Sequence, residues 1–292
     1  METMEINNNY DYICETKGKY PQLSHASNII TKYSGKLKSK EEDALTKLIP
    51  EYSIYLHKMM ELSAYDKYAI EKKVDYLNEY YNFMHNNDLE NAFSSQGKFR
   101  PTILEEFLYL LFKDYVELVK QRYDDNDVLG SGAVKAYSNL YFKAKDFKDF
   151  IKTPEIGVNE KDQDYAIYRT FDITINEKTP LQIRIPAIAI EAKTYIDKTM
   201  LDSIIATAEK IKSGNPHTRF IAVAERYDVS YAVDPAYSRI DQIYILRKSI
   251  RKNDWADIDK DVVWRLFEET TQHLERPWSD IGARIRDEGV VI

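Results

Sequence analysis

An acid and a base end a strongly apolar run of this chain, two residues apart. Glu191 and Lys193 close the segment Pro-Ala-Ile-Ala-Ile-Glu-Ala-Lys, residues 186–193. In an extended strand side chains alternate between faces, so both groups emerge on one side, about 6.7 Å apart along the chain, and Ala192 points to the other side. Such a pair alone is more often solvated at the end of a buried strand, so its meaning depends on the rest of the chain.

A second carboxylate, Asp164, is brought back to this pair by a predicted β-hairpin. The residues on either side of the turn-like stretch 176–180 alternate apolar and polar. Asp164 and Glu191 are equally far from the middle of that turn, so antiparallel pairing would place them opposite each other, with Cβ atoms about 5 Å apart if no bulge intervenes. The rival Asp172 would face Ile183 in this register, well away from Glu191, so we favour Asp164.

Two acids and one base in one small volume predict a divalent metal site. Like charges this close repel each other unless a positive group lies between them. Mg²⁺ suits such hard oxygen ligands, because it keeps several waters and takes only one or two protein carboxylates. The ion would activate a water and neutralise charge on a phosphoryl oxygen, while Lys193 positions the nucleophile. This combination predicts a phosphodiester hydrolase.

The elements after Lys193 predict an α/β fold. A helix starts near 197–199 and ends at Gly214, and the apolar stretch 220–224 follows as a buried strand, parallel to its predecessor through a right-handed crossover. Another strand is expected near 244–246 and a last helix over about 259–274. We therefore expect an α/β (mixed α+β) core, with a central mixed β-sheet flanked by helices.

The N-terminal third has a different residue pattern, one that is typical of helices. Segments near 41–60 and 64–86 carry Leu, Tyr and Met at helical spacing, and no convincing strand precedes residue 97. We expect residues 1–97 to form an N-terminal helical region that serves DNA recognition, dimerisation or both. Residues 98–292 are expected to form the catalytic domain.

The acid, the intervening strands and the Glu-x-Lys, in this order, resemble the PD-(D/E)XK nuclease superfamily, and within it the type II restriction endonucleases of the BbvCI-like group. The resemblance covers about residues 98–275 and includes an early acidic helix (101–107), the helix after the catalytic strand (198–212) and a later strand (240–247). Several motifs in the right order are more specific than any one alone. Gln163 stands where the superfamily motif has Pro. The sequence of the motif therefore differs at this position, but the acid that supplies its chemistry is kept.

The resemblance implies a Mg²⁺-dependent, sequence-specific double-stranded DNA endonuclease with a restriction-endonuclease-like core. Asp164 and Glu191 would hold the metal with help from the Ala192 carbonyl, and Lys193 would assist the attacking water. One such site cuts one strand, so a double-strand break implies two subunits. Because the BbvCI-like group includes enzymes of two related chains, we expect either a homologous second subunit (a heterodimer) or a homodimer.

A further acid is expected on the helix that begins near Pro101, a good first-turn residue. By helical spacing Glu105 lies closer to the centre of the buried stripe than Glu106 does, and a buried-side acid is costly without partners. In the superfamily, a Glu on this helix often joins the metal cluster, which favours Glu105. The alternative for either residue is a first-turn acid that complements the helix dipole.

Candidate DNA contacts come from local clusters of basic and amide side chains. The net charge of −7 argues mildly against a nucleic-acid binder, because phosphate contacts supply much of the affinity, but the distribution matters more. The polar, Gly-containing stretch 124–132 is interpreted as a connection. For every cluster, the alternative to a DNA contact is an ordinary solvent-exposed run of charged residues. The candidates are Lys98, Arg100, Lys135, Asn139, Lys143 and Lys145.

Composition narrows the class of protein. The chain of 292 residues is long enough for one large domain or two, and no window approaches the roughly 20 apolar residues of a membrane helix. Residues 1–10 are acidic and Asn-rich, unlike a signal peptide, and the single Cys14 fits the cytoplasm, where we expect the protein. Two other functions stay open: a catalytically silent DNA-binding or scaffolding subunit, and a structure-specific DNA repair nuclease of the same fold.

Overall fold

In the computed structural model, the described residues of the N-terminal part form five helices. They are α1 (Glu2–Lys19), α2 (Ser24–Tyr33), α3 (Ser39–Glu61), α4 (Lys67–Asn86) and α5 (Pro101–Arg122). The structure describes residues 2–35, 38–89, 92–93, 99–124, 128–152, 155–174, 180–250, 255–276, 278, 280–289 and 291. No helix in these ranges is long and apolar enough to cross a bilayer.

A five-stranded sheet follows, in the spatial order β1-β2-β3-β4-β5. Its first three strands pair antiparallel, whereas β3, β4 and β5 are parallel. The strands are β1 (Leu129–Lys143), β2 (Glu155–Ile173), β3 (Leu181–Ile196), β4 (Arg219–Tyr227) and β5 (Gln242–Ser249). The remaining helices are α6 (Phe147–Lys152), α7 (Lys198–Gly214), α8 (Lys260–Glu275) and α9 (Ile281–Asp287), with a short 3₁₀ turn, η3 (Pro235–Tyr237). This is the mixed sheet with flanking helices that the sequence predicts.

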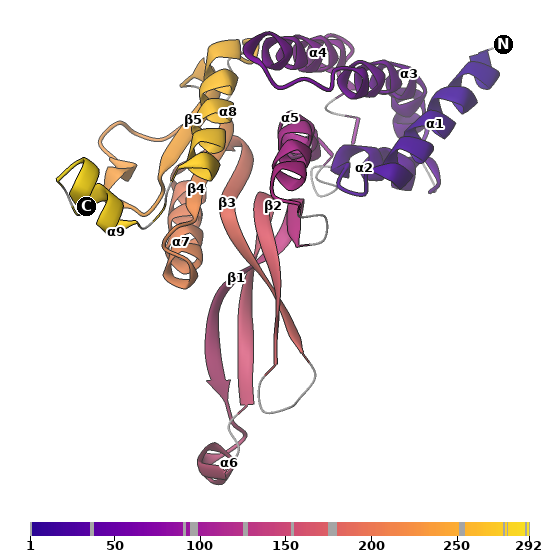
Figure 1. Ribbon diagram of the computed structural model, residues 1–292. Helices are drawn as coiled ribbons and strands as arrows, with labels where there is room; N and C mark the ends of the chain where they lie inside the picture. The colour runs from indigo at the N-terminus through magenta and orange to yellow at the C-terminus, as the bar shows by residue number, and fades with distance from the viewer. Residues whose placement is uncertain are drawn as a thin grey trace.

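The central strand β3 is buried on both faces, as its apolar sequence requires. On one face Ile188 and Ile190 join a large core that runs from Ile13 on α1 to Phe267 on α8. On the other face Ala189 packs in a smaller cluster beneath Leu201 of α7. Helix α5 lies between the sheet and the N-terminal helices (Figure 1), so these helices share one continuous core with the sheet.

The expected hairpin forms, but a bulge shifts its register. Tyr165 faces Ile190, which continues the predicted pairing, and the register then changes by one residue between Ile167 and Tyr168. Asp172 consequently faces Gln182 rather than the expected Ile183, because the extra residue on β3 displaces everything between the bulge and the turn. The expected turn at 176–180 falls mostly outside the described residues.

The interpretation of 124–132 as a connection was wrong beyond its first residues, because β1 begins at Leu129. Two register irregularities, at 132/134 and 137/139, interrupt the alternation of β1, so the period of two that marks a strand is broken. Strands β1 and β2 form a long hairpin arm whose far end carries α6, away from the N-terminal helices (Figure 1).

Candidate active site

Two strand segments bring the predicted acids and base together. Asp164 immediately precedes Tyr165, which pairs with Ile190 on β3. The backbone N–H of Ala192 donates a hydrogen bond of 2.8 Å to Asp164 Oδ2, so the carboxylate is fixed against the neighbouring strand. Ala192 is itself buried on the opposite face from Glu191, as the alternation of a strand requires.

The ammonium of Lys193 lies among three oxygen atoms. Its Nζ is 3.2 Å from Asp164 Oδ2, 2.9 Å from Glu191 Oε1 and 3.1 Å from the carbonyl oxygen of Ala192. The side chains of Asp164, Glu191 and Lys193 are 27%, 17% and 28% exposed. Water therefore reaches the group, while the protein holds the four residues on rigid strands.

Burial and charge shift the titration of this cluster. Burial raises the pKa of Glu191 above its ordinary value, and Asp164 adds to the shift while Lys193 opposes it. Burial would lower the pKa of Lys193, but the carboxylates of Asp164 and Glu191 outweigh it and hold that pKa above its ordinary value. Lys193 is therefore protonated at neutral pH, so its side chain can act there as a cation but not as a base.

The oxygen donors fit a hard divalent cation. Asp164, Glu191 and the Ala192 carbonyl already converge on one positive charge, that of Lys193. Two carboxylates and a carbonyl are a donor set that Mg²⁺ accepts, with water completing the shell. Among the described residues, no three His, Cys, Asp or Glu side chains gather closely enough to bind a metal ion. A metal here would thus use two acids and a backbone oxygen.

The expectation that Glu105 lies nearer the buried side of its helix than Glu106 was wrong. Glu106 is only 1% exposed and Glu105 is half-buried. Glu106 accepts hydrogen bonds from Tyr52 Oη (2.7 Å) and the Ala26 backbone N–H (3.0 Å), both in the N-terminal helices. Since α5 is covered by the sheet on one side and by helices on the other, a single apolar stripe does not identify its buried face. Glu105 does not join Asp164 and Glu191 in a three-acid metal group.

The candidate DNA contacts differ in their surroundings. Arg100 donates to Glu225 at 3.1 Å, and this fully buried carboxylate also accepts from Arg247 at 2.8 Å. Arg100 is therefore tied to the inside of the protein. Lys98 lies outside the described residues. The other four are exposed along β1 and just beyond it: Lys135, Asn139, Lys143 and Lys145.

A further acid, Asp162, was not singled out by the sequence analysis. It lies two residues before Asp164 on β2, is exposed, and its charge helps to raise the pKa of Glu191. The same-face spacing of two residues was the signal that could have found it.

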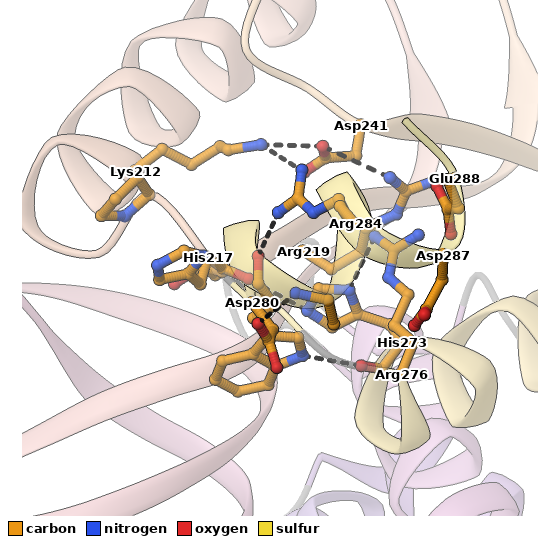
Figure 2. Close-up of a pocket in the computed structure, with 14 residues that line it drawn as sticks. Lys212, His217, Arg219, Asp241, His273, Arg276, Asp280, Arg284, Asp287 and Glu288 are labelled. Carbon is orange, nitrogen blue, oxygen red and sulfur yellow. Dashed lines mark hydrogen bonds and ion pairs between the residues drawn. The ribbon is translucent and has the colours of Figure 1, made fainter. Parts of the chain in front are cut away.

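A polar cavity of about 530 Å³ lies away from these residues, between the end of α7, the start of β4 and α9 (Figure 2). Several of its charged side chains form ion pairs. Lys212 bonds both oxygens of Asp241 at 2.7 Å, and Arg219 bonds Asp241 and Glu269. These ion pairs join α7 and α8 to the sheet, and the cavity has none of the predicted catalytic residues.

Comparison with known proteins identifies the family. The model of the Bpu10I restriction endonuclease family matches residues 96–273, which include Asp164, Glu191 and Lys193. A solved structure described as the native BbvCI A2B2 tetramer at low resolution shares the fold, with a TM-score of 0.68 and 20% sequence identity, over 87% of this chain and 96% of that chain. A search of curated proteins gave no match. The chain therefore belongs to the Bpu10I restriction endonuclease family of type II site-specific nucleases.

Proposed function

We propose that this chain is a subunit of a Mg²⁺-dependent restriction endonuclease that hydrolyses phosphodiester bonds at a specific double-stranded DNA sequence, one strand per active site. The observation that supports it best is that Asp164, Glu191 and the Ala192 carbonyl all direct oxygen atoms at one positively charged group, the ammonium of Lys193. Membership of a restriction endonuclease family supplies the reaction class.

The residues divide the work by charge. Bound Mg²⁺ would lower the pKa of a water and neutralise charge on the scissile phosphate. Asp164 and Glu191 hold the ion, and the hydrogen bond from Ala192 N–H keeps Asp164 in place. Lys193, protonated because of its two acid neighbours, donates hydrogen bonds to the attacking water and to the charge that develops on the phosphate. Glu105 is left out of the proposed ligand set.

The enzyme is proposed to act as a pair of subunits in the cytoplasm. One set of Asp164, Glu191 and Lys193 serves one strand, so cutting both strands needs a second set. The second set belongs either to a homologous second subunit or to a second copy of this chain. The BbvCI structure, described as an A2B2 tetramer, is an example of an assembly of two kinds of chain with this fold.

A digest of a long DNA of known sequence tests this function. The purified chain is incubated with the DNA and Mg²⁺, alone and with the product of any neighbouring homologous gene, and the ends of the fragments are sequenced. We expect discrete fragments or nicks at one recurrent sequence, and none when EDTA replaces Mg²⁺. Cutting that follows flaps or junctions regardless of sequence would contradict a restriction activity, and a silent chain beside an active partner would contradict catalysis by this subunit.

A further inference from the structure

The end of the β1–β2 arm exposes large apolar side chains. Helix α6 is six residues long and places Phe147, Phe150 and Ile151 on one face, at spacings of three and four. These side chains are 75%, 53% and 65% exposed, and Phe142 at the end of β1 is 70% exposed. Together they form what we call the arm tip, residues 142–152.

Positive charge surrounds these apolar groups. The arm tip holds four lysines and two aspartates, in a chain whose net charge is −7. Both aspartates face backbone amides, because Asp146 accepts from the N–H of Asp149 at 2.8 Å and Asp149 accepts from the N–H of Lys145 at 3.0 Å. Lys145, Lys148 and Lys152 form no ion pair with any described residue.

This mixture fits nucleic acid better than protein. Lysine is depleted in the buried centre of protein interfaces, because its charge must be desolvated there. Protein–DNA interfaces are instead strongly positive, and proteins that bind the minor groove often insert Phe or Ile between base steps. Four lysines interleaved with Phe147, Phe150 and Ile151 match that second pattern.

The length of the arm fixes where on the DNA the contact would lie. Glu155, where β2 begins, is nine residues from Asp164, which is about 30 Å of extended strand. One turn of B-DNA, 10 to 10.5 bp, spans about 34–36 Å. If the arm follows the duplex, its tip reaches the DNA about nine base pairs from the scissile phosphate.

We propose that the arm tip is a DNA-binding element that contacts the duplex about one helical turn from the cleaved bond, with lysines on phosphates and the phenylalanines against the minor groove. The inference rests on the proposed nuclease function, which provides the DNA substrate. It adds a contact outside the cleaved site and a minimum length of flanking DNA.

Salt dependence of binding tests the lysines without any need for cleavage. Affinity for a random 40-bp duplex is measured without metal from about 50 to 200 mM salt, for the wild type and for Lys145→Ala, Lys148→Ala and Lys152→Ala combined. Loss of three phosphate contacts should reduce the slope of log affinity against log salt concentration by about 2.7. The DNA affinity of the wild type should therefore fall about 40-fold more than that of the variant over this range. The combined Lys→Arg variant keeps the charge and should keep the slope. An unchanged slope in the alanine variant would overturn the proposal.

The flanking DNA tests the position of the contact. Two duplexes carry the mapped cleavage site, one with flanks of about two helical turns and one with flanks of about half a turn. The wild type should bind the long duplex at least about tenfold more tightly, and both the alanine variant and Phe147→Ser with Phe150→Ser should bind the two equally. Equal binding of the two duplexes by the wild type would overturn the proposed reach.

The outcomes separate this inference from the nuclease assignment. If the wild type cuts no DNA either alone or with a homologous second subunit, the nuclease proposal fails, while the salt slope on the random duplex still decides whether the tip binds DNA. If Phe147→Ser with Phe150→Ser lowers the molecular mass in sedimentation while flank dependence and salt slope persist, the tip contacts another subunit and the inference is wrong. Circular dichroism and the thermal midpoint of each variant check that the arm still folds.

Discussion

Lys193 shows how single side chains define this site. Its ammonium lies 2.9 Å from Glu191 and 3.2 Å from Asp164, and these two carboxylates keep it charged despite burial. The same pair of acids would repel each other without a cation. The ammonium of Lys193 therefore offsets the repulsion between the two carboxylates, and in the proposed hydrolysis it would provide the positive charge that faces a phosphate.

Glu106 offers a residue-scale prediction about stability. Burial raises its pKa from 4.5 to about 7, so the folded state binds a proton more tightly than the unfolded state does. Stability from this group is therefore lost as pH rises from about 4.5 towards 7, and the loss is complete above that range. Hydrogen bonds from Tyr52 and Ala26 and the charge of Lys17 limit the shift but do not reverse it.

Urea unfolding at pH 5 and pH 8 measures this loss. Replacing Glu106 by Gln removes the titration. The free energy of unfolding of the variant, relative to that of the wild type, should therefore be roughly 2 to 3 kcal/mol higher at pH 8 than at pH 5. The amide cannot accept from both Tyr52 and Ala26 as the carboxylate does, which adds a constant cost at both pH values. A difference between wild type and variant that does not change with pH would disprove the account of Glu106.

The convergence of Asp164, Glu191 and Lys193 was predictable from the sequence because a strand and a hairpin obey simple spacing rules. Glu191 and Lys193 share a face, and the symmetry about the turn led to Asp164. Glu105 and Glu106 could not be distinguished, because helical spacing identifies one apolar stripe and α5 is buried on two sides. Long-range partners such as Glu225 for Arg100 leave no local signal in the sequence.

At the scale of elements, the end of α7 is held against the arm. A Cβ added at Gly214 would lie 1.8 Å from the carbonyl oxygen of Ser138 on β1, so only glycine permits this approach. Ser138 Oγ also donates to the carbonyl of Lys210, at 3.4 Å. Helix α7 thereby supports both the catalytic strand that precedes it and the base of the arm.

Gly214→Ala should therefore destabilise the protein, because the backbone of β1 must move away from α7. We expect a loss of roughly 1 to 3 kcal/mol in the free energy of unfolding. Gly18→Ala is the matched control, since a Cβ there meets nothing within 4 Å on helix α1, and it should be neutral or stabilise by up to about 1 kcal/mol. Equal thermal midpoints for the two variants would show that the α7–β1 contact is not as close as the structure has it.

Regular elements were largely predictable, and irregular ones were not. Helices α3, α4, α5, α7 and α8 lie within a few residues of the expected segments, and β4 follows its apolar stretch. Strand β1 was missed because its two bulges break the alternation that identifies a strand. The bulge at Ile167/Tyr168 was also invisible, because an extra residue on β3 changes the partners but not the pattern of each strand.

At the scale of the molecule, the helices before residue 98 and the sheet share one core. The buried cluster includes Leu45 and Tyr52 of α3, Phe107 of α5 and Ile190 of β3. Buried charges also join the two parts, because Tyr81 of α4 donates to Glu225 of β4 at 3.1 Å. Separating the parts would expose this apolar surface and remove the hydrogen bond of Tyr81 to Glu225, although Glu225 would keep Arg100 and Arg247 as partners.

A fragment of residues 98–292 should therefore not fold by itself. We expect it to lack a cooperative thermal transition and to be digested rapidly by protease, whereas the full chain unfolds in a single transition that includes the N-terminal helices. Circular dichroism and limited proteolysis of both proteins measure this. A sharp melting transition of the fragment would contradict a shared core.

The central claim, that Asp164, Glu191 and Lys193 form the cutting site, is tested most directly by single-turnover cleavage of plasmid DNA with Mg²⁺. Glu191→Gln and Lys193→Met should each reduce the rate at least about 10² to 10³-fold. Glu191→Gln should bind DNA no more weakly than the wild type, because it loses a negative charge. Asp172→Asn, which changes a carboxylate of β2 that faces Gln182 rather than Glu191, should cut as the wild type does. Cleavage at the wild-type rate by Glu191→Gln or Lys193→Met would contradict the account.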